Sequence, residues 1–151
     1  MDKNQMLPQL SGWSAIACVE GLRKSNDMSA RFGLSLSEPQ MRALARRRQE
    51  ALLDSGRVEL GEGILPRLIE AFCDSPYLCQ ANWEESLGDL QELFYYFKNE
   101  SRDRLSDDEL IASMKRLFDG PARGATEYLA GLPVEAFTDP DWGEELLWNE
   151  D

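Results

Sequence analysis

The chain has 151 residues, 42% of them hydrophobic and 29% charged, which is typical of one globular domain. No apolar run is long enough to cross a bilayer, and the net charge of −12 opposes binding to phosphate backbones. We therefore expect neither a membrane nor a nucleic acid among the partners of this protein.

Histidine is absent, and the chain has three cysteines, Cys18, Cys73 and Cys79. An odd, small set of cysteines in a chain that needs no disulfides is typical of a reducing compartment, so we predict a cytoplasmic protein. The cysteine spacing matches no common zinc pattern. We predict no metal and no cofactor, and the missing histidines remove the commonest general base.

The N-terminal region predicts a helix over residues 13–24, followed by a short helical turn over residues 26–32. Ile16, Val19 and Leu22 recur at helical spacing, so we expect them to face the core.

The next predicted helix begins after Ser37, a typical N-cap residue, and ends at Gly56. Arg42 and Arg46 are four residues apart, which suits either a solvated or an acid-binding face. Arg48 lies nearer the apolar stripe, where we expect it to pair with a carboxylate from another helix. The expected apolar face contains Met41, Leu44, Ala45, Leu52 and Leu53.

A glycine-rich connector follows over residues 57–63, with a possible short extended piece at Val58–Leu60. The next helix should have Pro66 in its first turn and should end before Pro76, since proline is not accepted further inside. Its apolar stripe consists of Ile64, Leu65, Leu68, Ile69 and Phe72.

The helix predicted to be central to the core follows Asn82, which resembles an N-cap residue. Its apolar stripe consists of Trp83, Leu87, Leu90, Phe94 and Phe97, with Leu93 and Tyr96 widening it. The Ser106-Asp107-Asp108-Glu109 sequence is a capping box that predicts another helix, ended by Gly120. Residues 126–130 predict one or two more turns.

No strand-like alternation of useful length occurs, so the fold class we predict is all-α. We expect a compact array of about five or six helices in a single domain over residues 1–131. Residues 132–151, with seven carboxylates and no basic residue, are expected to form an acidic, aromatic C-terminal tail.

Polar and aromatic side chains in two stretches could form a small pocket that recognises a ligand or a peptide. Tyrosine, lysine and glutamate can perform acid–base chemistry without histidine where burial shifts their pKa values. The alternative is that the tyrosines simply bridge the core and water. The candidate residues are Asp74, Ser75, Tyr77, Tyr95, Lys98, Asn99 and Glu100.

The C-terminal tail offers a second candidate surface. Its apolar residues are spaced as in an amphipathic helix that could enter the groove of a partner. Alternatively, Trp142 and Trp148 dock on the domain itself, and a homodimer is also possible. The candidate residues are Trp142, Leu146, Leu147 and Trp148.

Two strings are distinctive, FCDSPY at residues 72–77 and FYYFKNE at residues 94–100. With Arg48, residues 50–52, residues 56–59 and residues 106–110, they resemble a small family of bacterial helical proteins of unknown function. The resemblance extends over about residues 30–131. It implies a free-standing bacterial protein and no particular activity or cofactor.

Because the usual catalytic groups are missing, a non-enzymatic protein–protein interaction module is the function we predict, with another protein as the partner. The alternative is a small-ligand binding protein or a histidine-independent enzyme that uses the Tyr/Asp/Lys/Glu pocket.

Overall fold

The computed structural model describes the backbone of residues 3–142 and the side chains of residues 14–142. Over this range the chain is helical and contains no strand, which confirms the all-α prediction. The helices are α1 (Lys3–Ser29), the 3₁₀ turn η1 (Ala30–Phe32), α2 (Glu38–Ser55), α3 (Leu65–Phe72), α4 (Trp83–Glu100), α5 (Asp107–Asp119), α6 (Thr126–Ala130) and α7 (Glu135–Thr138).

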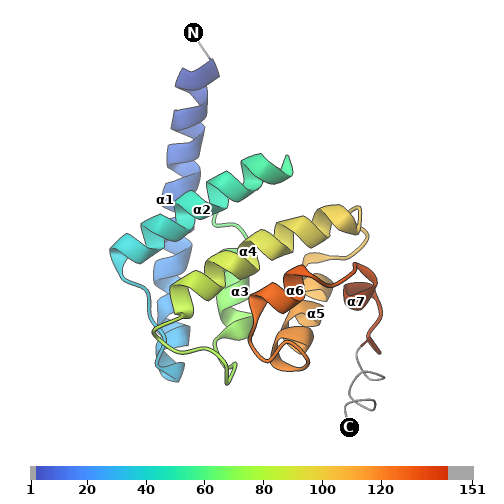
Figure 1. Ribbon diagram of the computed structural model, residues 1–151. Coiled ribbons are helices and arrows are strands. Elements are labelled where there is room, and N and C mark those ends of the chain that lie inside the picture. The colour runs from blue at the N-terminus through green and yellow to red at the C-terminus, as the bar shows by residue number, and fades with distance from the viewer. Residues whose placement is uncertain (1–2, 143–151) are drawn as a thin grey trace.

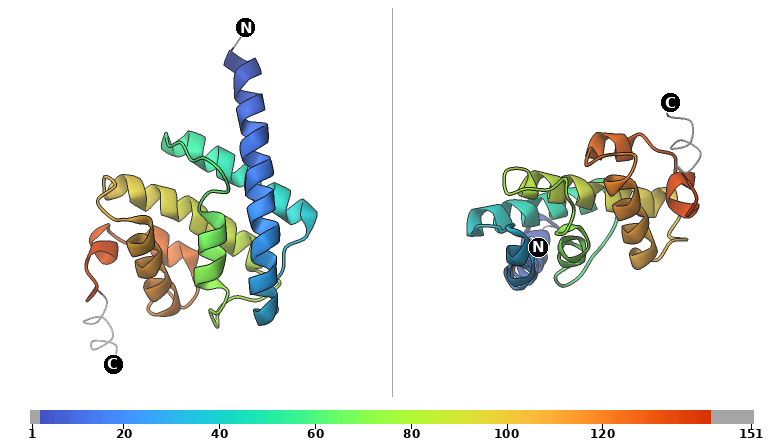
Figure 2. Two further views of the ribbon diagram at one scale, coloured as in Figure 1. Left: turned by 180° about the vertical axis from the view of Figure 1, so that it is seen from behind. Right: turned by 90° about the horizontal axis from the view of Figure 1, so that it is seen from below.

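The helices are arranged from one end of the molecule to the other (Figures 1 and 2). At one end α1 packs on α2 and α3, and its first turns extend beyond the rest of the domain. In the middle, α4 packs against α2, α3, α5 and α6. At the other end α7 packs on α5. Among the described residues α1 has no direct packing with α4 to α7, so its position depends on α2 and α3.

The core is built around α4, as its apolar stripe predicts. All five stripe residues, from Trp83 to Phe97, are buried. The prediction is wrong for Tyr96, which is half-exposed, whereas Tyr95, which is not part of the predicted stripe, is buried. The reason is the neighbour of the helix: α2 packs on the flank of α4 and covers a side that periodicity alone assigns to solvent.

A glycine allows the close approach of α2 to α4. A Cβ atom at Gly88 would lie 2.8 Å from Nε of Arg47, and closer still to the rest of its guanidinium group. From this position the Arg47 side chain forms ion pairs with Asp89 and Glu92, at 3.0 Å and 2.5 Å. Arg47 therefore joins α2 to α4.

The helix ends follow the sequence closely. Ser37 and Ser106 each form a capping box, and Gly56 ends α2 in the left-handed conformation with φ 67°. Asn82 is the N-cap residue of α4 as predicted, but its side chain makes no cap hydrogen bond. Instead the Asn82 amide accepts a bond from Cys79 N and donates one to Tyr77 O, which closes the loop before α4.

The first helix is longer than predicted and runs through residues 24–29 without a break. Val19 and Leu22 face the core as expected, but Ile16 is 63% exposed, so the prediction for Ile16 is wrong. Because α2, α3 and η1 are the only described elements that pack on α1, one narrow side of this helix is covered by them.

The core continues beyond Gly131, where the tail was expected to begin. Ala136 and Phe137 are buried, and the Phe137 ring lies 3.9 Å from that of Phe97. Trp142 packs against the core, and Arg116 donates a hydrogen bond of 2.8 Å to its carbonyl oxygen. Residues 132–142 thus pack on the domain. The other candidate tail residues, Leu146, Leu147 and Trp148, lie outside the described residues.

The Ser106 cap gives a prediction. Ser106→Ala removes the hydrogen bond that Glu109 N donates to the Ser106 hydroxyl, so we expect the free energy of unfolding to fall by about 1 kcal/mol. Urea unfolding followed by circular dichroism measures this change. The control is Ser35→Ala, because the exposed Ser35 hydroxyl makes no hydrogen bond within residues 14–142. An equal effect of both variants would contradict the prediction.

Candidate functional site

The first three of the seven predicted pocket residues pack against α5. The Asp74 carboxylate accepts a hydrogen bond of 2.5 Å from Lys115 Nζ, and Ser75 donates one of 2.6 Å to Asp119. The ring of Tyr77 lies edge-on against a phenylalanine of α5. These contacts attach the loop after α3 to α5.

The next three lie at the C-terminal end of α4. Lys98 Nζ is 3.0 Å from a carboxylate oxygen of Asp107, and Asn99 accepts a hydrogen bond of 2.7 Å from Arg57. Glu100 is exposed and makes no polar side-chain contact with any described residue. Lys98 therefore contacts the start of α5, and Asn99 contacts the connector that follows α2.

Tyr95 belongs to a third place. Its hydroxyl donates a hydrogen bond of 2.5 Å to Glu59, in the connector between α2 and α3. Six of the seven residues thus enter three separate sets of contacts, and these contacts do not bring them together as one pocket.

The contacts of Tyr95 reveal a buried polar network that the sequence predicts only in part. Arg48 is 2% exposed, and its Nε donates a hydrogen bond of 2.7 Å to the Glu59 carboxylate. The other guanidinium nitrogens donate to the Glu59 carbonyl and to Ser14. Arg48 was correctly expected to pair with a carboxylate, but that carboxylate is in the connector and not in another helix. Only the acidic Glu59 close to Arg48 in sequence could have indicated this.

Burial and charge fix the protonation states in the network. Burial opposes the charge on Arg48, but the hydrogen bond and negative charge of Glu59 outweigh it, so the Arg48 pKa is raised. Burial raises the pKa of Tyr95 far above its ordinary value, and the Glu59 charge adds to this. Burial also raises the pKa of the Cys18 thiol. Tyr95 and Cys18 are thus neutral at physiological pH, which suits a structural network and not proton transfer.

Two surface hollows flank α1 where it crosses α2. The larger has a volume of about 440 Å³, and Arg48 and Glu59 are among its lining residues. Leu53, Val58 and Leu60 line it and are 71%, 88% and 83% exposed. The predicted burial of Leu53 is therefore wrong, and Val58–Leu60 forms no strand.

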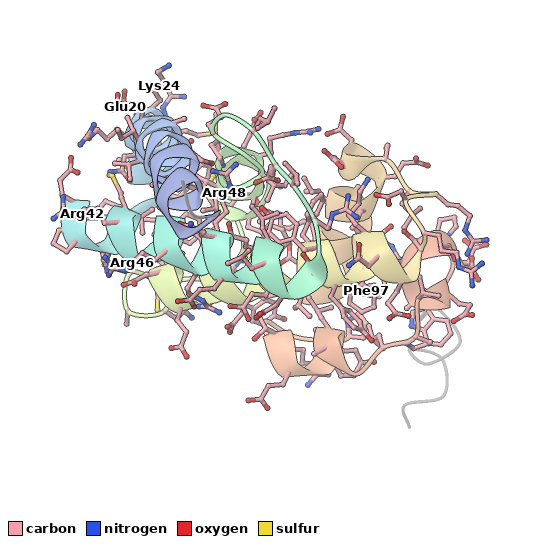
Figure 3. The ribbon with its side chains drawn as sticks, turned by 90° about the horizontal axis from the view of Figure 1, so that it is seen from above. Glu20, Lys24, Arg42, Arg46, Arg48 and Phe97 are labelled. Carbon is pink, nitrogen blue, oxygen red and sulfur yellow. The ribbon has the colours of Figure 1, made fainter. Side chains whose placement is uncertain are left out.

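The smaller hollow, which we call the arginine hollow, has a volume of about 330 Å³. Three arginines of α1 and α2 line it together with apolar side chains and one carboxylate, Glu20. Arg42 and Arg46 project on one side of α1, and Arg48 lies on the other (Figure 3). The lining residues are Ala15, Ile16, Val19, Glu20, Arg23, Arg42, Ala45, Arg46 and Gln49.

The arginines of this hollow differ in their partners. Arg23 pairs with Glu20 and, at 2.6 Å, with Glu38, whereas Arg42 lies 3.8 Å from Glu38. Arg46 is exposed and has no carboxylate partner among the described side chains. All the paired side chains are about half-exposed, so their ion pairs contribute little and can be exchanged for a new carboxylate.

Some kinds of site have no counterpart in the part of the chain that the structure describes. Within it, His, Cys, Asp and Glu side chains form no cluster of three or more that could hold a metal ion. None of the described helices combines the length and apolar character needed to cross a membrane.

The fold and the site define a small all-α protein with an arginine-lined hollow beside a buried ion pair. A model of the family of unknown function DUF6323 matches residues 21–140, so the chain belongs to this family. This match, which begins within α1 and ends after α7, confirms the predicted membership of a family of unknown function. Comparison with curated proteins and with solved structures gave no match.

The connector provides a matched pair of variants that tests the buried network. Gly61 and Gly63 both have positive φ, 67° and 75°. A Cβ atom at Gly61 meets nothing within 4 Å, whereas one at Gly63 would lie 2.7 Å from Arg48 Nε. We expect Gly61→Ala to cost about 1–2 kcal/mol of unfolding free energy for the left-handed backbone alone.

Gly63→Ala should cost at least about 2 kcal/mol more than Gly61→Ala, because it also pushes Arg48 away from Glu59. Urea unfolding of the two variants measures the difference. Equal losses would show that the ion pair tolerates displacement.

Tyr95 gives a prediction for alkaline pH. Folding raises the pKa of Tyr95, so this tyrosine stabilises the folded state fully at pH values below its pKa in the unfolded chain, about 10. This stabilisation is lost as the pH rises above about 10. We expect Tyr95→Phe to cost about 1 kcal/mol at neutral pH, since it removes the hydrogen bond to Glu59.

This difference in unfolding free energy should shrink as the pH rises above about 10, because only the unsubstituted chain loses stability through Tyr95. Denaturant unfolding of both proteins over this pH range measures it. A difference that stays constant with pH would contradict the assignment.

Proposed function

We propose that this protein is a cytoplasmic, bacterial, non-enzymatic interaction module that binds an acidic segment of another protein in the arginine hollow. One observation carries the proposal: three arginines line a hollow together with apolar side chains, on a chain whose net charge is −12. The cytoplasmic location is supported by the three unpaired cysteines.

The charge pattern favours a carboxylate-bearing partner. A strongly acidic chain repels an acidic segment over most of its surface, so a local group of arginines also determines where such a segment binds. Guanidinium groups bind carboxylates through paired, charge-assisted hydrogen bonds. Arg46, which has no carboxylate partner among the described residues, is the first group available to the segment.

The apolar side chains that line the hollow favour a partner segment with an apolar side chain between its carboxylates. Ile16 is 63% exposed, and Ala15, Val19 and Ala45 lie around it. Covering this apolar surface would add a favourable hydrophobic contribution to the free energy of binding, beyond that of the charges. The partner segment is therefore amphipathic, with acidic groups beside one or two apolar side chains.

Other functions have less support. The negative net charge opposes phosphate backbones, so we do not expect a nucleic acid in the hollow. The predicted alternative, a ligand-binding or catalytic Tyr/Asp/Lys/Glu pocket, is weakened because Asp74, Tyr95 and Lys98 enter separate sets of contacts. The larger hollow has no charge pattern that indicates what would fill it.

Site-specific photo-crosslinking in bacterial cells that express the protein tests the proposal. A photoreactive residue in place of Ile16 should crosslink a partner through a segment that contains acidic and apolar residues. Arg42→Glu together with Arg46→Glu should lower the yield roughly tenfold, because the hollow then repels the carboxylates.

The control is Arg31→Glu with Arg102→Glu, which changes the net charge equally at two exposed positions outside the hollow. This control should crosslink as the parent does. An equal loss of yield in both double variants, or crosslinking to segments without acidic residues, would contradict the proposal.

A further inference from the structure

The chain itself contains a segment with the chemistry that the arginine hollow fits. Residues 143–151 have the sequence GEELLWNED, with four carboxylates, three large apolar residues and no basic residue. This is the combination of acidic and apolar groups that the lining of the hollow favours.

The arginine hollow and the end of the described chain lie at opposite ends of the domain (Figures 1 and 2). The described chain ends at Trp142, which Arg116 holds beside α5 and α7. The arginine hollow is formed by α1 and α2, with α4 between the two ends. The last nine residues of one molecule therefore start far from its own hollow, whereas a second molecule can present its hollow directly to them.

We infer that residues 143–151 of one copy bind in the arginine hollow of a second copy and compete there with the acidic partner. The inference rests on the proposed function, since it assigns an occupant to the same hollow. It also gives the exposed Ile16 a covering surface in the absence of a partner.

The geometry of this contact determines how the protein would assemble. Each molecule contributes its arginine hollow and its residues 143–151, so the contact joins two different surfaces. A pair of molecules then has one arginine hollow and one such segment unused. Such head-to-tail contacts continue into short chains unless a ring closes. Because the charges of the hollow are largely exposed, the association should weaken as salt is added.

Sedimentation velocity of the full chain, over a range of concentrations at low and high salt, tests the inference. We expect the mean mass to rise with concentration at low salt and to stay at the monomer value at high salt. Two variants should remain monomeric: Arg42→Glu/Arg46→Glu, and Glu144→Lys/Glu145→Lys/Glu150→Lys. The Arg31→Glu/Arg102→Glu control should associate as the parent does.

A mixture of the two monomeric variants is the decisive sample. The acidic hollow of the first variant can bind the basic segment of the second, and the unchanged segment of the first can bind the unchanged hollow of the second. An equimolar mixture should therefore associate although neither variant associates alone. Because each variant keeps the surface that the other has changed, this result would show that both chains fold and that the hollow of one copy meets the segment of another.

Three results would overturn the inference: a monomeric parent at every concentration, unchanged association of either reversal variant, or no association in the mixture. Its failure is distinguishable from that of the proposed function. If the parent is monomeric but its crosslinked partner is still lost with Arg42→Glu/Arg46→Glu, only the self-association is wrong. If the mixture associates but no partner protein is crosslinked, the proposed function is wrong.

Discussion

The Arg48–Glu59 ion pair is the interaction on which the rest of the structure depends. Removing these charges from water is costly, and the cost is offset only where the geometry is good and the remaining donors have partners. Here the guanidinium group donates to Glu59 and Ser14, and Tyr95 donates to the same carboxylate. The pair therefore joins α1, α2, the connector and α4. Since α1 packs on no described element other than α2, α3 and η1, the network also fixes the walls of the arginine hollow.

The parts of the fold that could be predicted depend on local chemistry. The capping box at Ser106 and the stripe from Trp83 to Phe97 depend on residues three or four positions apart, so periodicity and cap chemistry identify them. The burial of Tyr95 and the exposure of Ile16 depend on which helix packs alongside. Asparagine is a residue type that suits a helix cap, but the Asn82 side chain forms hydrogen bonds within its own loop instead of with the first turn of α4.

The candidate site was harder to predict for the same reason. The spacing of Arg42 and Arg46 indicates one face of a helix, and an acid-binding role was one of the two possibilities it left open. The hollow also needs α1 to cross α2 beside those arginines, which no local pattern in either helix specifies. The polar residues of the FCDSPY and FYYFKNE strings are close in type but not in space, because α5 and the connector provide their partners.

The sequence separations within the buried network have a consequence for the order of folding. Arg48 and Glu59 are 11 residues apart, whereas Tyr95 follows Glu59 by 36 residues. Closing the shorter loop has the lower entropic cost, and a chain made on the ribosome can form that contact before α4 has emerged. Helix α2 and the connector would then form an early unit in which the ion pair is still partly solvated. The arrival of α4 would complete it by removing the ion pair from water.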